Sequence, residues 1–471
     1  MRLGKSALVY FVSQVGLSIS GFIATFAIAR LLGAEILGVY SVTVALLFWL
    51  NVPTTAISST VTKRISEGTS QGSFLTIGFL TNGALAIVIS LGIVAFGEYI
   101  DRYVGAPVST ILMVIVLGNI SLYTVTGMLD GQKMVAIRGI LQALERVLRT
   151  GLQVALIFLG WELSGLLFGH AVSLMVASLV GVLLFEVRPS IPTRQQIRRF
   201  FKYAQYSWLG TIKTRAFAWM DTIVLAFFVS STLIGIYEVA WRLASIFALI
   251  SLSVQQTLFP TLSELSADGE TDRIHHLLNE GLLFTGIFCI PGIVGATILG
   301  DRVLRIYRPE FAQGAQILVI LVVARMISAF GSQFLSAVNA VDRPDLAFRI
   351  NAAFVISNVG LNIVLITEYG WYGAAGATAI SALVTLAYGY YILYRLIGRP
   401  NVPTREISYQ ILSAGLMGAV LVPVVENIPQ NHYLTISAVG LGVFVYLLIL
   451  LIVSERVRQK ARSVFLNSID N

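Results

Sequence analysis

Charged side chains occur inside several long apolar stretches of this sequence, where a lipid bilayer would disfavour them. They are Arg149, Lys213, Arg215, Asp221, Glu238, Arg242 and Arg325. Arg325 is the clearest case, because it lies about midway along the run ILVILVVARMISAFGSQFL. An arginine at the centre of a membrane span costs about 2.5–3.5 kcal/mol on insertion scales, so its side chain should face protein or water. We therefore expect these residues to line a polar cavity.

Cations outnumber acids in this set, which gives the expected cavity a formal charge of about +3. A guanidinium binds phosphate through two parallel hydrogen bonds, whereas a lysine acts as a point charge. The candidate ligands for an anionic group such as phosphate or pyrophosphate are Arg325, Lys213, Arg215, Arg242 and Arg149. Lys213 and Arg215 are about 200° apart around a helix, so they cannot both point at the same spot. Lys213 is favoured for the cavity.

Asp221 and Glu238 are the two carboxylates in this set. A carboxylate inside the membrane that changes its protonation or binds a cation can couple a conformational change to protons or sodium ions. Structural roles are open for both residues as well. Glu238 and Arg242 are four residues apart in the order that favours an ion pair within one helix, and Asp221 can pair with Lys213.

Four amide side chains in the apolar stretches are candidates for contacts with sugar hydroxyl groups. They are Gln153, Asn358, Asn362 and Asn51. Amides within a membrane also form hydrogen bonds between neighbouring helices, and this alternative applies to each of them.

The apolar stretches themselves make up most of the chain. Hydrophobic residues account for 56% of the sequence and charged residues for 12%, with a mean hydropathy of +0.82. Soluble domains contain about 25% charged residues. Runs of about 20 apolar residues predict an all-α integral membrane protein with about 14 transmembrane helices. Their approximate ranges are 6–29, 37–57, 74–96, 108–129, 143–160, 164–185, 203–229, 233–258, 281–300, 314–337, 349–368, 372–395, 408–426 and 434–454.

The first part of the sequence is repeated in the second. A shift of 197 positions places ILGVYSV (36–42) on LIGIYEV (233–239) without a gap. Further on, TGLQVALIFLGW (150–161) matches VGLNIVLITEYGW (359–371) with one inserted residue, which pairs Arg149 with Asn358 and Gln153 with Asn362. An even number of helices in each copy makes the two copies parallel, and substrate sites in such proteins lie between the copies.

The repeat predicts four segments. Residues 1–187 form an N-terminal lobe of six helices, and residues 203–397 form a C-terminal lobe of six. Between them, 188–202 is a basic cytoplasmic linker, either an amphipathic segment on the membrane surface or a simple basic loop. Residues 398–471 hold two additional helices and a tail.

The distribution of Lys and Arg predicts the orientation. Of the 32 such residues, 22 fall in segments on the side of the N-terminus, which indicates that both termini are cytoplasmic. The net charge of +8 is explained by these loops, so no nucleic-acid partner is expected. The single cysteine, Cys289, excludes an intrachain disulfide.

Three segments resemble the Wzx-type polysaccharide flippases, in the group that includes the MATE drug exporters and the lipid II flippases. They are ARLLGAEILGVYSVTVALLF (29–48), WMDTIVLAFF (219–228) and EVAWRLASIFALISLSVQQTLFPTLSEL (238–265). The resemblance implies two lobes forming a V, with the central cavity open alternately to each side. It implies a protein of a prokaryotic cell membrane that moves a polyprenyl-(pyro)phosphate-linked oligosaccharide to the outer leaflet, for surface polysaccharide or glycoprotein glycans. A monomer is expected, with a polymerase or ligase of the same pathway as a candidate partner.

Two other functions are considered. A cation-coupled drug exporter of the MATE type has a key acid in its first helix, whereas SALVYFVSQVGLSISGFIATFAIA contains none. A membrane glycosyltransferase or ligase needs catalytic acids or a metal site in a large outer loop. The outer loops here are short, and the longest lacks paired carboxylates at metal-ligand spacing. The sequence therefore predicts no enzyme, no cofactor and no metal.

Overall fold

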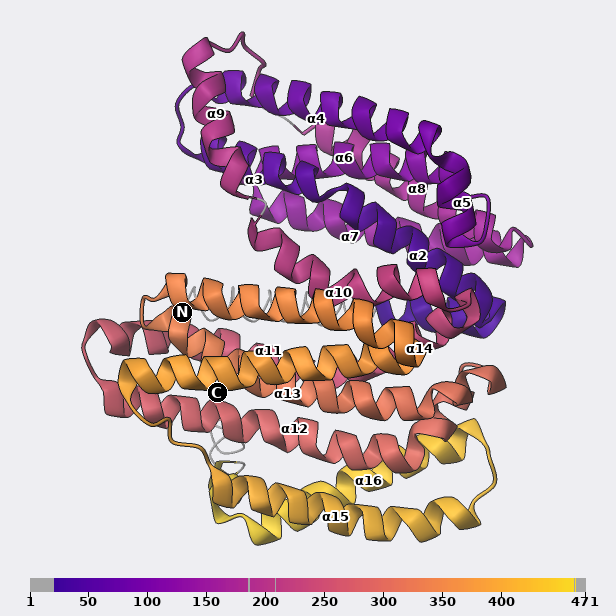
Figure 1. Ribbon diagram of the computed structural model, residues 1–471, viewed down its shortest axis with the longest axis vertical. Helices are drawn as coiled ribbons and strands as arrows, with labels where there is room; N and C mark the ends of the chain where they lie inside the picture. The colour runs from indigo at the N-terminus through magenta and orange to yellow at the C-terminus, as the bar shows by residue number, and fades with distance from the viewer. Residues whose placement is uncertain (1–20, 185–186, 208, 461, 463–471) are drawn as a thin grey trace. The chain divides into compact units, whose positions relative to one another are not determined.

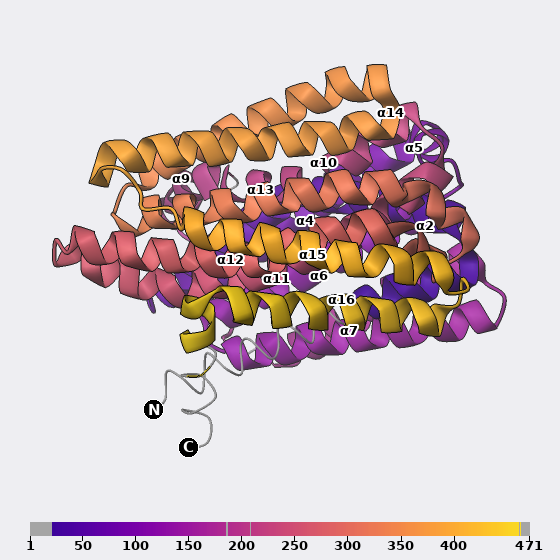
Figure 2. The ribbon, with the colours of Figure 1, turned by 90° about the horizontal axis from the view of Figure 1, so that it is seen from below.

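The computed structural model describes residues 21–184, 187–207, 209–460 and 462, and it excludes the side chains of residues 206, 209–217 and 250. Within these residues the regular structure is helical throughout. The chain forms two compact units, Met1–Gly235 and Ile236–Asn471. Each unit is a layered bundle of helices (Figures 1 and 2).

The first unit begins with a helix at Gly21–Leu32 and continues to the start of α11. Its other helices are α2 (Ala34–Leu50), α3 (Val52–Ser66), α4 (Gln71–Ala95), α5 (Gly97–Val104), α6 (Ser109–Gly131), α7 (Val135–Phe158), α8 (Glu162–Val182), α9 (Arg194–Ser207) and α10 (Leu209–Phe228).

The second unit contains most of α11 and all later elements. These are α11 (Ser231–Ala267), α12 (Thr271–Arg305), the 3-10 helix η1 (Pro309–Gly314), α13 (Ala315–Ala340), α14 (Pro344–Ile397), α15 (Thr404–Asn427) and α16 (His432–Val453). Helices α15 and α16 lie side by side (Figures 1 and 2).

The helices agree with the 14 predicted spans. Nine of the described helices are long and apolar enough to cross a membrane, or ten if the bent pair α2 and α3 is one span. Helix α14 contains two predicted spans, α7 and α10 match two more, and the first predicted span lies mostly outside the described residues. The prediction of an all-α polytopic membrane protein is confirmed, whereas a central cavity between two lobes stays a prediction.

Helix α14 folds back on itself at Gly370. This glycine has φ 56° and ψ −134°, a backbone conformation that is essentially restricted to glycine. Beyond the reversal, a Cβ atom on Gly373 would collide with the backbone carbonyl of Leu365. The two arms of α14 are visible in Figure 1.

The two sequence copies differ at the second span. In the first copy, α2 and α3 meet at Asn51 with a bend of 48°, and Pro53 lies in the first turn of α3. Proline lacks an N–H and its ring disturbs the preceding turn, so a bend is expected there. The corresponding residue of the second copy is Ile250, and α11 runs as one helix past it.

Repeat-related small residues allow a close helix crossing in the first unit. Gly38 of α2 faces the backbone of Ser231, and Gly235 faces the backbone of Ala34. These four residues are two equivalent pairs, because the shift of 197 positions places Ala34 on Ser231 and Gly38 on Gly235. A Cβ atom on either glycine would overlap the opposing backbone carbonyl, so only glycine fits here.

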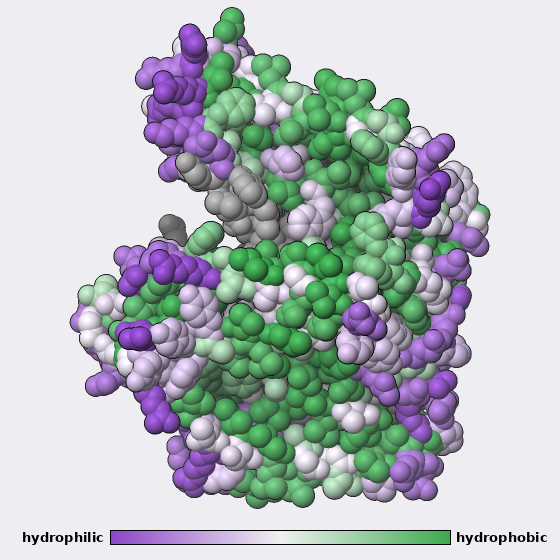
Figure 3. Space-filling model, in the orientation of Figure 1, coloured by the Kyte–Doolittle hydropathy of each residue, from purple (hydrophilic) through white to green (hydrophobic). Residues whose placement is uncertain are grey.

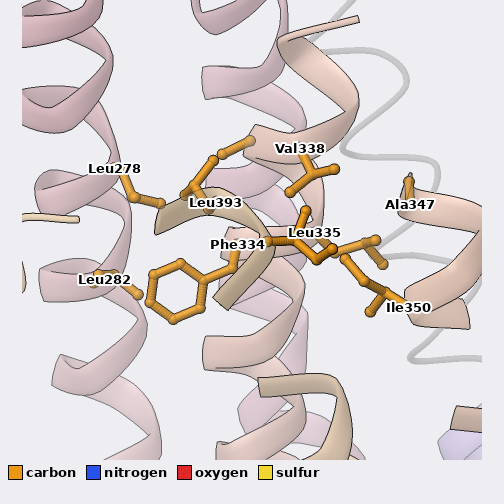
Figure 4. Close-up of a cluster of buried hydrophobic side chains, with 10 residues drawn as sticks. Leu278, Leu282, Phe334, Leu335, Val338, Ala347, Ile350 and Leu393 are labelled. Atoms are coloured by element: carbon orange, nitrogen blue, oxygen red, sulfur yellow. The ribbon is translucent and has the colours of Figure 1, made fainter. Parts of the chain in front are cut away.

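Aliphatic side chains fill the core between the helices. In the second unit, Leu282 of α12, Phe334 and Val338 of α13, and Ile350 and Leu393 of α14 pack together (Figure 4). On the face drawn in Figure 3, hydrophobic side chains cover the middle of these helices and hydrophilic ones gather at the helix ends. This pattern fits helices whose middles contact lipid.

The predicted linker is helical from Arg194 onward and belongs to the first unit. Helix α9 covers most of 188–202 and packs against α3 and α4. Its Phe200 is fully buried, while the Arg199 guanidinium lies 3.6 Å from the carboxylate of Glu67. Because α10 also packs against α2 and α3, the compact units divide after Gly235 and not at the linker.

Candidate functional site

Arg325 of α13 is held against α11 in the second unit. Its guanidinium carbon lies 3.9 Å from the centre of the Trp241 ring, a cation–π arrangement. One of its terminal nitrogens donates a hydrogen bond to the Ser245 hydroxyl, at 2.5 Å. Trp241 and Ser245 are one helical turn apart and uncharged. The stack and the hydrogen bond together fix the orientation of the guanidinium.

Arg242 and Glu238 lie on the same side of α11. Their side chains form an ion pair of 2.8 Å, so the predicted intrahelical pair is confirmed. The Glu238 side chain is only 6% exposed and that of Arg242 is 35% exposed, which leaves part of the guanidinium accessible. The Arg242 Nε is buried and has no hydrogen-bond partner among the described residues. The carboxylate thus holds one edge of the guanidinium and another edge remains available.

In the first unit, the predicted cation with a described side chain is Arg149 of α7. It lies 3.5 Å from the carboxylate of Glu145, one turn earlier, and 3.1 Å from Nε2 of His170 on α8. A guanidinium only donates hydrogen bonds, so Nε2 of His170 must be the unprotonated acceptor and Nδ1 must carry the proton. The Arg149 side chain is 24% exposed.

Hydrogen bonds extend this cluster to α2. The Tyr40 hydroxyl lies 3.4 Å from Nδ1 of His170 and accepts a hydrogen bond from the Gln153 amide at 2.9 Å. The same amide donates to the carbonyl of Leu166 at 2.8 Å. Gln153 therefore joins three helices. This is the alternative role predicted for the amides, a hydrogen bond between neighbouring helices.

The other predicted amides are buried. Asn51 donates to the Leu47 carbonyl of its own helix at 2.8 Å. The amide oxygens of Asn51 and Asn358 are buried without a hydrogen-bond partner among the described residues. Asn362 is also fully buried. An unpaired buried amide oxygen costs free energy, so Asn51 and Asn358 are sites where an incoming donor would be favoured.

The structure thus groups the predicted residues into two sets. Arg325 and the Glu238–Arg242 pair belong to the second unit, while in the first unit Arg149 and Gln153 are linked through His170 and Tyr40. Asp221 is buried on α10 of the first unit. The side chains of Lys213 and Arg215 lie outside the described residues. Among the described residues, no group of His, Cys, Asp or Glu side chains is arranged to hold a metal ion.

Several members of these sets were not among the predicted residues: Glu145, His170, Tyr40, Trp241 and Ser245. For two of them, the sequence contained a pattern that could have identified them. Glu145 precedes Arg149 by four residues, the spacing that identified Glu238 and Arg242. Tyr40 coincides with Tyr237 in the aligned copies. Inclusion of Glu145 lowers the formal charge of the predicted set from about +3 to about +2.

An apolar cavity of about 420 Å³ lies within the second unit. Its walls come from α11, α12, α13, α15 and α16, and include Phe247, Pro291, Met417 and Tyr446. Proline at position 291 lies inside α12, which continues through it. A cavity of this kind accommodates a branched hydrocarbon chain and offers few partners to a polar one.

Solved structures with this fold are flippases and drug transporters. One is a lipid II flippase, MurJ, in an inward closed conformation, with a TM-score of 0.79, 17% identity and coverage of 94% of this chain and 98% of that one. Another is an inward-facing multidrug transporter of the MATE family in the MOP superfamily, with a TM-score of 0.65 and 13% identity over 80% of this chain and 94% of that one. The fold is therefore that of the flippases and multidrug transporters of this superfamily.

Family models make the assignment narrower. The model for polysaccharide biosynthesis proteins matches residues 3–266, and the model for the lipid II flippase MurJ matches residues 147–444. The chain belongs to the polysaccharide biosynthesis protein family.

Curated relatives cover between three quarters and nearly all of the chain. A probable flippase, AglR, from Haloferax volcanii is 28% identical over 99% of both chains. A probable low-salt glycan biosynthesis flippase, Agl15, from the same organism is 27% identical over 83% of this chain and 84% of its own. A putative O-antigen transporter from Shigella flexneri is 22% identical over 76% of this chain and 89% of its own.

Proposed function

We propose that this protein is a flippase that moves a polyprenyl-(pyro)phosphate-linked oligosaccharide from the cytoplasmic to the outer leaflet by alternating access. The family and its glycan-flippase relatives support this class of substrate. The observation that carries the proposal is Arg325, a guanidinium within a membrane helix that is stacked on Trp241 and bonded to Ser245. The task is transport, so no bond-making chemistry is assigned to the protein.

The anionic part of the substrate is assigned to the cations. Arg325 of α13 contacts Ser245 of α11, Arg242 of α11 pairs with Glu238, and Arg149 supplies a third guanidinium in the first unit. Lys213 and Arg215 are assigned the same role from the sequence. Bidentate hydrogen bonds from arginine suit a phosphate oxygen pair, and they release it more easily where water enters.

The remaining parts of the substrate are assigned by polarity. Asn51 and Asn358 have buried amide oxygens with no described partner, and a conformation that exposes them would let them accept from sugar hydroxyls. Gln153 and Asn362, which coincide in the aligned copies, are assigned the same role from the sequence. The apolar cavity beside Phe247 and Tyr446 suits part of the polyprenyl chain. A substrate that is part glycan, part phosphate and part hydrocarbon would contact each of these surfaces.

Ion coupling is assigned to Asp221 and Glu238, which are buried carboxylates within helices. The Glu238 carboxylate pairs with Arg242, so protonation of Glu238 would free this guanidinium for the substrate. Coupling to protons or to sodium ions is compatible with these residues.

The protein is a multi-pass integral membrane protein, and we assign it to the cell membrane of a prokaryote with both termini cytoplasmic. The charge distribution, with 22 of 32 Lys and Arg residues on one side, supports this orientation. We expect a monomer that works beside a polymerase or ligase of the same glycan pathway.

Deletion of the gene tests the proposed function. We expect cells to lose surface glycan and to accumulate the lipid-linked oligosaccharide on the cytoplasmic face of the membrane, with recovery on re-expression. Sensitivity to toxic cations with normal glycans would indicate a drug exporter instead, and glycolipid accumulation on the outer face would indicate a ligase. Accessibility of the accumulated glycolipid to an impermeant glycosidase in intact and opened cells distinguishes the two faces.

A further inference from the structure

A polar cleft of about 460 Å³ lies where α15 begins and α16 ends. Its lining includes Arg405 and Tyr409 of α15 and Glu455, Arg456 and Arg458 of the segment after α16. The backbone leaves the helix at Ser454, with φ −103° and ψ 105°, and resumes it at residue 455. This break places the side chains of the tail over the start of α15.

Acidic partners neutralise one of the three arginines. Arg456 contacts the carboxylates of Glu280 at 2.6 Å and Glu406 at 3.4 Å, and donates to the amide oxygen of Asn279 at 2.7 Å. Lys460 also pairs with Glu280. These contacts fix the tail against α12 and give the cleft one rigid side.

The other two arginines form no direct ion pair among the described residues, although Glu406 and Glu455, which also line the cleft, act electrostatically on Arg405. The Arg405 Nε donates to the hydroxyl of Tyr409 at 2.8 Å, and its guanidinium lies 5.5 Å from the centre of that ring. Arg458 is exposed. Neither forms an ion pair with any residue that the structure describes, and Glu455 accepts a hydrogen bond from Gln459 at 3.2 Å. The cleft therefore presents two guanidinium groups that lack a direct acidic partner.

The cleft also adjoins the lipid-facing surface of the same helices. Both α15 and α16 are long and apolar enough to cross a membrane. Large apolar side chains stand exposed next to the cleft, namely Ile411 and Leu412 on α15 and Leu448 and Ile452 on α16, with exposures of 47–66%. A lipid whose chains lie along these side chains has its headgroup level with the cleft, and Tyr409 is of the type enriched at that level.

We propose that this cleft binds the phosphate headgroup of an anionic membrane lipid. Arg405 and Arg458 are the ligands, and Arg456 acts as a positioning residue through Glu280 and Glu406. Two guanidinium groups can donate hydrogen bonds to both free oxygens of a singly charged phosphodiester, whereas a choline headgroup would bring a cation toward them. This lipid is a bound component distinct from the transported substrate, because Arg325, Arg242 and Arg149 take no part in the cleft.

The test compares lipid binding by the purified full-length protein and by its Arg405→Gln/Arg458→Gln double variant. Native mass spectrometry after delipidation, with phosphatidylglycerol, phosphatidylcholine or glycerol 1-phosphate added, gives the affinity of each. Arg395→Gln is the matched control, because Arg395 makes the same contact with a tyrosine one turn away, to Tyr391 at 3.1 Å, but does not line the cleft.

We expect phosphatidylglycerol to bind more tightly than phosphatidylcholine. The double variant should bind phosphatidylglycerol about 30-fold more weakly than the unmodified protein does, because each arginine near the membrane surface contributes roughly a fivefold gain in affinity. The Arg395→Gln variant should bind it as the unmodified protein does. Equal binding by the double variant, or equal binding of the two lipids, overturns the proposal. Tight binding of glycerol 1-phosphate would show a soluble-anion site and would also overturn it.

Discussion

At the scale of single residues, the guanidinium groups differ in what surrounds them. Arg149 lies between Glu145 and His170, and Arg242 is paired with Glu238. Arg325 stacks on the Trp241 ring and donates a hydrogen bond to Ser245, and these two contacts orient its guanidinium. A group held in one orientation loses less conformational freedom when it binds a ligand. We therefore expect Arg325 to contribute to headgroup binding.

Arg325→Gln should lower glycolipid translocation in proteoliposomes at least about tenfold, because it removes charged hydrogen bonds of about 1.5–3 kcal/mol. Arg325→Lys should recover little of the loss, since lysine lacks the planar group that stacks on Trp241. Arg343→Gln is the control, because Arg343 pairs with Asp345 at an exposed helix end. Normal translocation by Arg325→Gln would contradict the proposed headgroup site.

Gln153 and Asn358 are both predicted sugar-contacting amides on repeat-related spans, and they are expected to respond differently to replacement. Gln153→Leu breaks hydrogen bonds to Tyr40 and Leu166, and should cost about 1–3 kcal/mol of stability, seen as a lower melting temperature in detergent. Asn358→Leu removes an amide whose oxygen has no described partner, and should change stability little while it weakens glycan translocation. If both variants lose stability equally, the sugar-contact assignment of Asn358 fails.

At the scale of helices, a few backbone positions decide the connections. Gly370 permits the sharp reversal that makes two spans of α14, and Pro53 accompanies the bend between α2 and α3. Gly38 and Gly235 allow the backbones of repeat-related helices to approach. Apolar periodicity alone predicts none of these features, since each depends on backbone geometry.

Gly370→Ala should destabilise the protein by at least about 1 kcal/mol, because a Cβ atom is strained at φ 56°. Gly376→Ala, in the same helix, is the control. A Cβ atom at position 376 would meet nothing within 4 Å, and alanine favours a helix by about 1 kcal/mol over glycine. Thermal unfolding in detergent compares the two, and equal melting temperatures would contradict the role of Gly370.

At the scale of the whole molecule, the order of spans and the basic loops predict the orientation. Cysteine labelling tests it on a Cys289→Ala background, which removes the single native thiol. An impermeant maleimide added to intact cells should label Tyr433→Cys, in the exposed first turn of α16, and should leave Arg399→Cys unlabelled until the cells are opened. The reverse pattern would show that the termini face outward.

The sequence by itself determined the all-helical membrane class, the spans and the duplication. Membrane helices must be long and apolar to satisfy their backbone within lipid, and this requirement is written residue by residue in the chain. The sequence also indicated the ion pair between Glu238 and Arg242, because residues four positions apart share a helix face.

Only the tertiary structure decided which distant side chains meet. Arg325 stacks on Trp241, 84 positions earlier, and Arg149 meets His170 on another helix. Such contacts depend on the rotation and the shift of one helix relative to the next. Small residues such as Gly38 influence both, because they allow two helix backbones to approach closely. No spacing within one helix encodes that rotation, so the partners of the charged residues became known only from the packed fold.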